Sequence, residues 1–360
     1  MSNHNEALAL CGGGGKGAYQ VGVLKAMCEN HVIDRFHCIS GTSVGALNAV
    51  LFALGDSELA ESVWLNYISP ETMLKRFDPQ KIEISRDTLK HILNKIGLSK
   101  IRSCNKKIYI YVHAIGEEEP TAYLLNDKED ERIINLLLAS SAMPIVYAPV
   151  PISRNEYIDG GITPLGNTPV KVLVENGYSK ITVIALDNEF NPRSLRNKGI
   201  NLYSLFPKEN FDFLRPSMYI GDLIDGTLDF SKESIKKRIL IGQFDAKLKY
   251  RERTNTSMSE KEKIITLASE TLHCANDFVD FIAFASFKNL NIDLPVLGGE
   301  VWYENIYKKD GWSIQRHNGL IPNHYRILDP DNVRKAWTLD PNELILQLLN
   351  YKNHIETRAK

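Results

Sequence analysis

The start of the chain constrains the fold most, because a short apolar segment, Ala7–Cys11, runs directly into four glycines, Gly12–Gly15. A run of this length and composition is typical of a buried strand in a parallel sheet. Apolar residues then recur at helical spacing after Gly17, and a second strand is predicted at Phe36–Ile39, followed by an apolar helix over Ala46–Leu54. This order of elements predicts an α/β fold, in which helices cover a mainly parallel sheet.

Composition and charge narrow the class of protein. The 360 residues are 43% hydrophobic and 24% charged, as in a globular protein. The net charge of −1 gives no overall basic field, so no nucleic-acid partner is expected. The best apolar run, Val44–Leu54, is shorter than the about 20 residues that a membrane span needs.

The cysteines and the N-terminus indicate the cellular compartment in which the protein is expected. The chain has five cysteines, an odd number, and no C-x-x-C pair, so neither a disulfide framework nor a zinc site is predicted. No basic segment followed by an apolar run occurs at the N-terminus, so we expect no signal peptide. Cysteines that form no disulfides are typical of a cytoplasmic protein, which is the compartment we expect. Any contact with a membrane would then be peripheral.

Three regions are expected along the chain. The regular alternation of strands and helices covers residues 6–206, which predicts one α/β domain as the place of any catalytic site. Residues 207–295 have a mainly helical pattern, and 296–360 suggest a small unit of strands and turns. This last region holds Trp302, Trp312 and Trp337, and the sequence gives it no function.

The glycine-rich loop, Gly12–Gly17, admits several interpretations. A phosphate loop of Walker type requires Lys and then Ser or Thr after the last glycine, but Ala18 follows Gly17. The dinucleotide fingerprint matches at its glycines, yet the second strand ends in Ser40 and Gly41 rather than in an acidic residue. Two interpretations remain. The loop either binds an oxyanion with its backbone N–H groups or is a purely structural turn.

A serine lies at the second strand-to-helix turn. Gly41–Gly45 reads G-x-S-x-G, the pattern of a nucleophile elbow, with Ser43 at its centre. Small flanking residues permit the sharp turn that exposes the serine oxygen, and the following helix adds its positive dipole end. The context of strand, turn and helix favours Ser43 as a nucleophile over a chance match.

The nucleophile needs a base to accept its proton. Asp159 precedes Gly160 and Gly161, which free the backbone to bend and to donate hydrogen bonds to the carboxylate. An ordinary Asp-Gly turn is the alternative. In a Ser–Asp–His triad the base would instead be a downstream histidine, for which the candidates are His273, His317 and His324.

The glycine loop, the serine turn and Asp159-Gly160-Gly161, together with the segment 138–144, resemble the patatin-like phospholipase family over roughly residues 6–190. The resemblance implies a three-layer α/β/α fold and a dyad of Ser43 as nucleophile and Asp159 as general base. It implies an oxyanion loop made of Gly12, Gly13, Gly14, Gly15, Lys16 and Gly17, in which the N–H groups of Gly13 and Gly14 act with that of Val44. The glycines at 41, 45, 160 and 161 would support these turns.

The implied reaction is hydrolysis of carboxylic esters in phospholipids or lysophospholipids through an acyl-enzyme, with no metal or cofactor. Two basic segments are candidates for lipid contact, an amphipathic helix over 85–97 and residues 232–253, although each is also explained as an ordinary packed or solvated helix. Two other functions stay open, a catalytically silent lipid-binding module on the same fold and an esterase with a true histidine.

Overall fold

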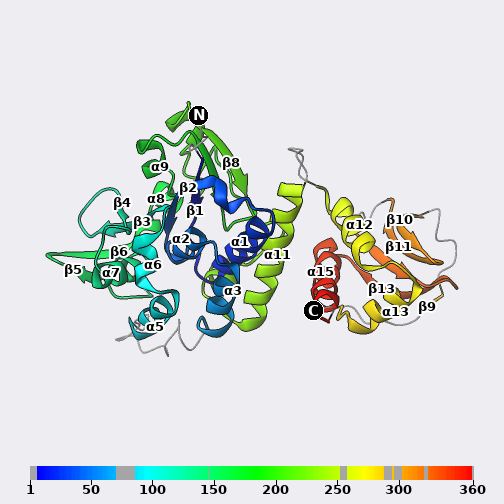
Figure 1. The fold of residues 1–360 in the computed structure, drawn as a ribbon. Coiled ribbons are helices and arrows are strands. Elements are labelled where there is room, and N and C mark those ends of the chain that lie inside the picture. Colours follow the sequence, from blue (N-terminus) through cyan, green and yellow to red (C-terminus); the bar gives the residue numbers. More distant parts are fainter. Residues whose placement is uncertain are drawn as a thin grey trace. The chain divides into compact units, whose positions relative to one another are not determined.

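The computed structural model describes residues 6–69, 86–144, 146–251, 258–287, 294–295, 302–319 and 323–358 (Figure 1). The chain divides into two compact units, Met1–Arg253 and Thr254–Lys360. This division differs from the boundaries expected at 206 and 295, because the strand and helix between residues 207 and 253 belong to the first unit.

An eight-stranded sheet forms the centre of the first unit, in the order β5-β6-β3-β2-β1-β7-β8, with β4 also paired to β3. The parallel strands are β1 (Glu6–Leu10), β2 (Phe36–Thr42), β3 (Lys107–Ala114), β7 (Lys180–Ile184) and β8 (Asn210–Leu214). The antiparallel strands are β4 (Thr121–Leu124), β5 (Val150–Ile152) and β6 (Asn155–Asp159). The predicted mainly parallel sheet is therefore confirmed.

Helices cover both faces of this sheet. On one face, α1 (Ala18–Glu29), α2 (Val44–Leu54) and α7 (Asp130–Ser140) pack on the strands, joined by α3 (Ser57–Asn66), α5 (Arg86–Ile96) and α6 (Leu98–Ser103). The other face carries α8 (Pro164–Asn167), α9 (Lys171–Glu175) and α10 (Leu202–Leu205). There Ala7 and Ala9 of β1 lie in one core with Leu173 and Leu202. The three-layer α/β/α architecture is thus as expected.

The long helix α11 (Lys232–Arg251) packs along α1 at very close range. A Cβ atom at Gly22 would overlap the carbonyl oxygen of Ile239, and one at Gly242 would overlap that of Tyr19. Glycine at both positions therefore allows the two backbones to touch. This contact is why α11, which the sequence places in a separate helical region, belongs to the first unit.

The two segments considered for lipid contact are partly accounted for by packing. In α5 the apolar side chains of Ile92, Leu93 and Ile96 are buried, so this stripe faces the protein core. In α11, Lys247 pairs with Glu29 and Lys249 pairs with Asp212, which offsets part of the basic surplus. Ser85, the side chains of Arg86, Leu89 and Lys90, and residues 252–253 lie outside the described residues.

The second unit combines helices with an antiparallel sheet. Its sheet has the order β10-β11-β12-β13-β9, with β9 (Leu294–Pro295), β10 (Tyr303–Lys309), β11 (Trp312–His317), β12 (Tyr325–Leu328) and β13 (Val333–Thr338). Its helices are α12 (Glu260–Thr271), α13 (Ala275–Phe284) and α15 (Pro341–Arg358). Phe278 of α13 stacks on Trp312, with ring centroids 5.3 Å apart. The expected strands and turns of the C-terminal region therefore form one sheet.

Candidate active site

Ser43 occupies a strained turn between β2 and α2. Its backbone angles, φ 57° and ψ −130°, lie outside the regions that non-glycine residues usually adopt. A Cβ at Gly41 would overlap the carbonyl oxygen of Gly45, and a Cβ at Gly45 would overlap that of Leu10. Both flanking glycines are thus required by close backbone contacts, and strain of this kind concentrates at functional sites.

Sheet register brings Asp159 to the same edge of the sheet as Ser43. Thr42 pairs with Tyr111 of β3, and Asp159 pairs with the next residue of that strand, Val112. The Asp159 carboxylate is 5% exposed and accepts a hydrogen bond of 2.7 Å from the Gly161 N–H. The Ser43 side chain lies close enough to this carboxyl to lower its pKa. The two residues that the sequence places far apart therefore meet.

Burial raises the pKa of Asp159 to about 6, against the hydrogen bonds from Ser43 and Gly161 and the charge of Arg196, which lower it. A carboxyl group with this pKa is ionised at neutral pH and remains basic enough to accept a proton from a serine hydroxyl. The environment of Asp159 thus suits a general base better than that of an exposed aspartate with a pKa near 3.9.

The segment after α7 connects the serine turn to the aspartate. The Ser140 hydroxyl accepts the Ser43 N–H at 2.9 Å and donates to the Tyr111 carbonyl at 2.7 Å. Two residues on, the Ala142 carbonyl accepts the Asp159 N–H at 2.9 Å. This explains the structural role of the segment 138–144, in which sequence reasoning singled out no individual residue.

Buried amides hold the two ends of the glycine loop. The Gln20 side chain donates to the Cys11 carbonyl at 2.9 Å, and the Asn48 side chain donates to the Gly17 carbonyl at 3.0 Å. Asn48 also donates to Gln20 and accepts from the indole of Trp64 at 2.9 Å. Gln20, Asn48 and Trp64 are fully buried. Nothing in the local sequence pattern marked these three residues.

The outer side of the loop is covered by residues 220–229, which include the π-helix η4 (Leu223–Thr227). Gly14 has a φ of +54°, and a Cβ there would overlap the Thr227 carbonyl oxygen. A Cβ at Gly15 would overlap that of Asp229. The glycine loop therefore lies directly against the backbone of this segment, which we call the cover segment.

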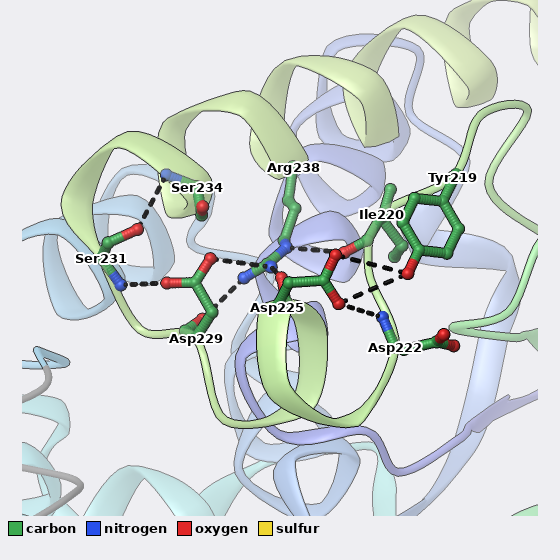
Figure 2. Close-up of polar contacts among 8 residues, drawn as sticks. All are labelled: Tyr219, Ile220, Asp222, Asp225, Asp229, Ser231, Ser234 and Arg238. Carbon is green, nitrogen blue, oxygen red and sulfur yellow. Dashed lines mark hydrogen bonds and ion pairs between the residues drawn. The ribbon is translucent and has the colours of Figure 1, made fainter.

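Figure 2 shows how Arg238 of α11 holds the cover segment. Its guanidinium, 3% exposed, donates to the carbonyl oxygens of Ile220, Asp225 and Asp229 at 3.1, 2.7 and 2.7 Å. It also contacts the Asp229 carboxylate at 3.2 Å. The Asp222 N–H donates to the Asp225 carboxylate at 2.8 Å. One buried side chain thus fixes the segment that walls the glycine loop.

A cavity of about 470 Å³ opens over these groups. Its lining includes Ser43, Asp159, Gly12, Gly13, Gly14, Lys16 and Val44, so most of the predicted site residues meet here. The apolar lining includes Leu47, Trp64, Ile92, Leu137, Met143 and Phe230. Lys16 and Arg196 also line it. A site of this size, which combines an apolar wall with a polar one, fits a small-molecule or acyl-chain ligand.

Gly161 also lines the cavity, and the other predicted residues support the site from outside the lining. Gly15 and Gly17 lie in the short helix η1 (Gly14–Gly17), where a Cβ at Gly17 would meet the Val44 side chain at 2.6 Å. Gly160 contacts the Tyr111 backbone. Asn167, which sequence reasoning missed, has its side-chain oxygen 2.8 Å from the Cβ positions of both Gly12 and Gly161.

The alternative histidine bases lie outside this unit. His273, His317 and His324 belong to residues 254–360, and the described lining of the cavity contains no histidine. Among the described residues, no group of His, Cys, Asp and Glu is arranged to hold a metal ion. None of the helices described is long and apolar enough to cross a membrane.

The first unit is thus a three-layer α/β/α fold with a strained serine at the turn after β2. Residues 8–174 match the family model "Patatin-like phospholipase", and the chain carries the domain of that family there. It is 27% identical over 214 residues to a cUMP-AMP-activated phospholipase of Escherichia coli. That match covers 54% of this chain and 64% of the relative, less than two thirds of its length.

Solved structures of similar fold include VipD from Legionella pneumophila, with 15% identity and a TM-score of 0.40. That comparison covers 79% of this chain and 76% of VipD. The ExoU–SpcU complex of Pseudomonas aeruginosa matches with 17% identity and a TM-score of 0.33, over 78% of this chain and 59% of the matched chain.

The pKa of Asp159 predicts the acid limb of any activity that uses it as a base. Activity should fall as the pH drops through about 6, because the protonated carboxyl cannot accept a proton. Since the folded-state pKa is raised, folding is favoured most at low pH, and this contribution is lost as the pH rises through about 6. A kcat/KM profile from pH 4 to 9 checks the prediction, and a limb centred below pH 5 would contradict it.

Proposed function

We propose that the chain hydrolyses carboxylic ester bonds of glycerophospholipids or lysophospholipids with a Ser43–Asp159 dyad. One observation carries the proposal most directly, the presence of Ser43 and the buried Asp159 side by side in the lining of one cavity, where Ser43 acts on the pKa of the carboxyl. The match to the patatin-like phospholipase model over residues 8–174 supports the lipid substrate class.

In the first step the Ser43 oxygen attacks the ester carbonyl carbon while its proton passes to Asp159. The tetrahedral intermediate collapses to an acyl-enzyme, and the protonated Asp159 returns the proton to the departing lysolipid or glycerol oxygen. Water then attacks the acyl-enzyme, again losing a proton to Asp159, and the Ser43 oxygen leaves with that proton as the fatty acid is released. The carboxylate is regenerated in each half-reaction, so the dyad needs no histidine.

The oxyanion of each intermediate would be bound by backbone N–H groups of Gly13, Gly14 and Val44. The glycine loop and the start of α2 border the same cavity as Ser43, which supports this assignment. Donors that are already fixed before the reaction stabilise the developing charge without reorganisation. The amide network at Cys11 and Gly17 and the cover segment provide that fixation.

The cavity also favours a phospholipid over a neutral ester. Its apolar wall accepts the acyl chain, and its polar lining carries Lys16 and Arg196 beside the carboxylates of Asp159, Asp187 and Glu189. Arg196 is exposed, so it can meet a phosphate headgroup at the rim. Burial lowers the pKa of Lys16, against the attraction of Asp187, which raises it. A phosphate would compensate both cations.

The substrate class is tested with the full chain and vesicles of phosphatidylcholine or phosphatidylglycerol, with fatty-acid and lysolipid release measured by mass spectrometry. We expect both products, and a lower rate on a diacylglycerol that lacks the phosphate. Arg196→Gln should narrow this difference between substrates. Equal rates on phospholipid and diacylglycerol would contradict the assigned roles of Lys16 and Arg196, and no lipid hydrolysis by a folded chain would favour a silent binding module.

The glycine loop gives a further prediction. Gly14→Ala should reduce hydrolysis by about a hundredfold or more, the effect of losing one oxyanion donor, because the new methyl group would push the loop away from Thr227. Gly177→Ala is the matched control, since Gly177 also has a positive φ, +83°, but nothing lies within 4 Å of its Cβ position. Rates and melting temperatures of both variants check this, and a native rate for Gly14→Ala would make the loop purely structural.

A further inference from the structure

The sheet of the second unit has two chemically different faces. Side chains alternate along a strand, and Trp312, Ile314 and Ile327 point to the helical side, where Trp312 stacks on Phe278. The opposite side, which we call the polar sheet face, carries rings and cations. Its members are Tyr303, Gln315, His317, His324, Arg326, Arg334 and Trp337.

Arg326 lies at the centre of the polar sheet face and is only 5% exposed. Its Nε donates to the Gln315 side-chain oxygen at 2.8 Å, and its guanidinium lies 3.4 Å from the centre of the Tyr303 ring. One terminal nitrogen, Nη2, is buried and has no hydrogen-bond partner among the described residues. Such an unpartnered buried donor is costly unless a ligand accepts from it.

Two further buried nitrogens of this face also lack a partner in the described part of the chain, the Nε of Arg334 and the Nε2 of His324. The other ring nitrogen of His324 is hydrogen-bonded to the Tyr303 hydroxyl at 2.7 Å, which fixes the orientation of the imidazole. Register places Arg326 and Arg334 on adjacent strands of the same face. Three unsatisfied nitrogens therefore gather on one side of one sheet.

In the described part of the second unit, the carboxylates near this face pair with cations other than Arg326 and Arg334. Glu304 pairs with Lys261 and Arg316, and Asp329 pairs with Lys335. Burial lowers the pKa of His324, and the charges of Arg326, His317 and Arg334 lower it further. Buried cations that repel one another and have unused donors favour the binding of an anion.

Flat aromatic surfaces adjoin these cations. Trp302, which is 60% exposed, stacks on His317 with ring centroids 6.3 Å apart and an interplanar angle of 23°. The Trp337 ring lies 5.4 Å from the guanidinium of Arg334. An exposed indole beside an anion site offers a stacking surface to a planar ring.

We propose that the polar sheet face binds an anionic ligand with an attached planar ring, the chemistry of a nucleotide. The phosphate would accept hydrogen bonds from Arg326, Arg334 and His324, and the ring would stack on Trp302. This inference rests on the second unit alone, so it holds or fails independently of the lipid hydrolase activity.

The full chain is titrated with AMP and flavin mononucleotide, which differ in ring size, by calorimetry and tryptophan fluorescence. We expect at least one of them to bind and to quench fluorescence, and to bind at least tenfold more tightly than adenosine, riboflavin or inorganic phosphate. Arg334→Gln and Arg326→Gln should each weaken binding tenfold or more. Trp302→Leu should weaken nucleotide binding but leave phosphate binding unchanged.

Arg316→Gln is the matched control, because Arg316 follows Gln315 in the same strand and its side chain points to the other face. It should bind as the native chain does. Circular dichroism confirms the fold of each variant, and the exposed Trp302 keeps the test valid if Arg326→Gln fails to fold. The proposal would be overturned if neither nucleotide binds, or if adenosine binds as tightly as AMP. It would also be overturned if Arg316→Gln weakens binding as much as Arg334→Gln does, or if single-stranded RNA binds much more tightly than either nucleotide.

Discussion

Replacing Ser43 by alanine should abolish lipid hydrolysis, with a loss of about 10⁶ in kcat, the effect of removing the nucleophile from a serine protease. The physical reason is that the acyl-enzyme cannot form without the serine oxygen. The strained backbone at φ 57° should be equally strained in the variant, so its melting temperature should stay close to that of the native chain. Fatty-acid release and labelling by a fluorophosphonate probe measure the effect.

Ser141→Ala is the matched control for this experiment. Ser141 lines the same cavity, but its hydroxyl donates to the Leu137 carbonyl at 3.0 Å, and we assign it no chemical role. This variant should keep its activity and its labelling. A fluorophosphonate that still labels the Ser43→Ala protein would show that another residue is the nucleophile.

The second large effect is expected for Asp159→Asn, which should slow hydrolysis by about 10⁴-fold, as the loss of the aspartate does in a serine triad. The amide keeps the shape of the side chain but cannot accept the Ser43 proton. Because the buried carboxylate is disfavoured in its charged form above pH 6, the variant should be at least as stable as the native chain at pH 8. Activity assays and thermal melts at pH 5 and pH 8 test both parts.

Controls for this variant separate the dyad from a triad. Asp187 is another carboxylate of the cavity lining, and it accepts a hydrogen bond from the Glu189 N–H. Asp187→Asn should therefore reduce the rate of hydrolysis far less than Asp159→Asn does. His273→Ala, His317→Ala and His324→Ala should each keep most of the hydrolase activity. If one of these histidine variants folds and loses as much activity as Asp159→Asn, the chain uses a histidine base.

The pH profile alone cannot make this distinction. A carboxylate base with an ordinary pKa would give an acid limb below the range of histidine, but burial raises the pKa of Asp159 to about 6. An unperturbed histidine titrates near 6.5. The two limbs would nearly coincide, so the substitutions decide between the bases.

Local patterns in the sequence were enough to predict the α/β architecture and to single out Ser43 and Asp159 as candidates. The strand at Ala7–Cys11, the glycine loop and the serine turn each encode their geometry within a few residues, because close backbone contacts there exclude side chains. The pairing of the serine with the aspartate was implied only by the resemblance of these motifs to one family, because no local pattern relates two residues so far apart in the chain.

The supporting residues could not be found in this way. Gln20, Asn48 and Trp64 form one buried network only after α1, α2 and α3 have packed together. Ser140 reaches Ser43 across 97 positions of the chain. A lone buried amide or hydroxyl has no sequence signature, since its partner is chosen by tertiary packing rather than by spacing.

The domain boundaries differ for a similar reason. Residues 207–253 read as a helical extension, because strand β8 (Asn210–Leu214) is short and the helix α11 is long and basic. What joins them to the catalytic unit is the pairing of β8 with β7 and the glycine contact between α1 and α11. Neither is visible as a periodic pattern.

The contact of Arg238 with the cover segment determines how far a fragment of this chain must extend to keep the whole site. The family match ends at residue 174, yet the wall of the glycine loop comes from residues 226–229 and is held by a side chain nine positions further on. A fragment cut after residue 206 would keep Ser43 and Asp159 but lose the backbone that packs against Gly14 and Gly15. Transplanting this active site to another scaffold would require the helix as well as the motifs.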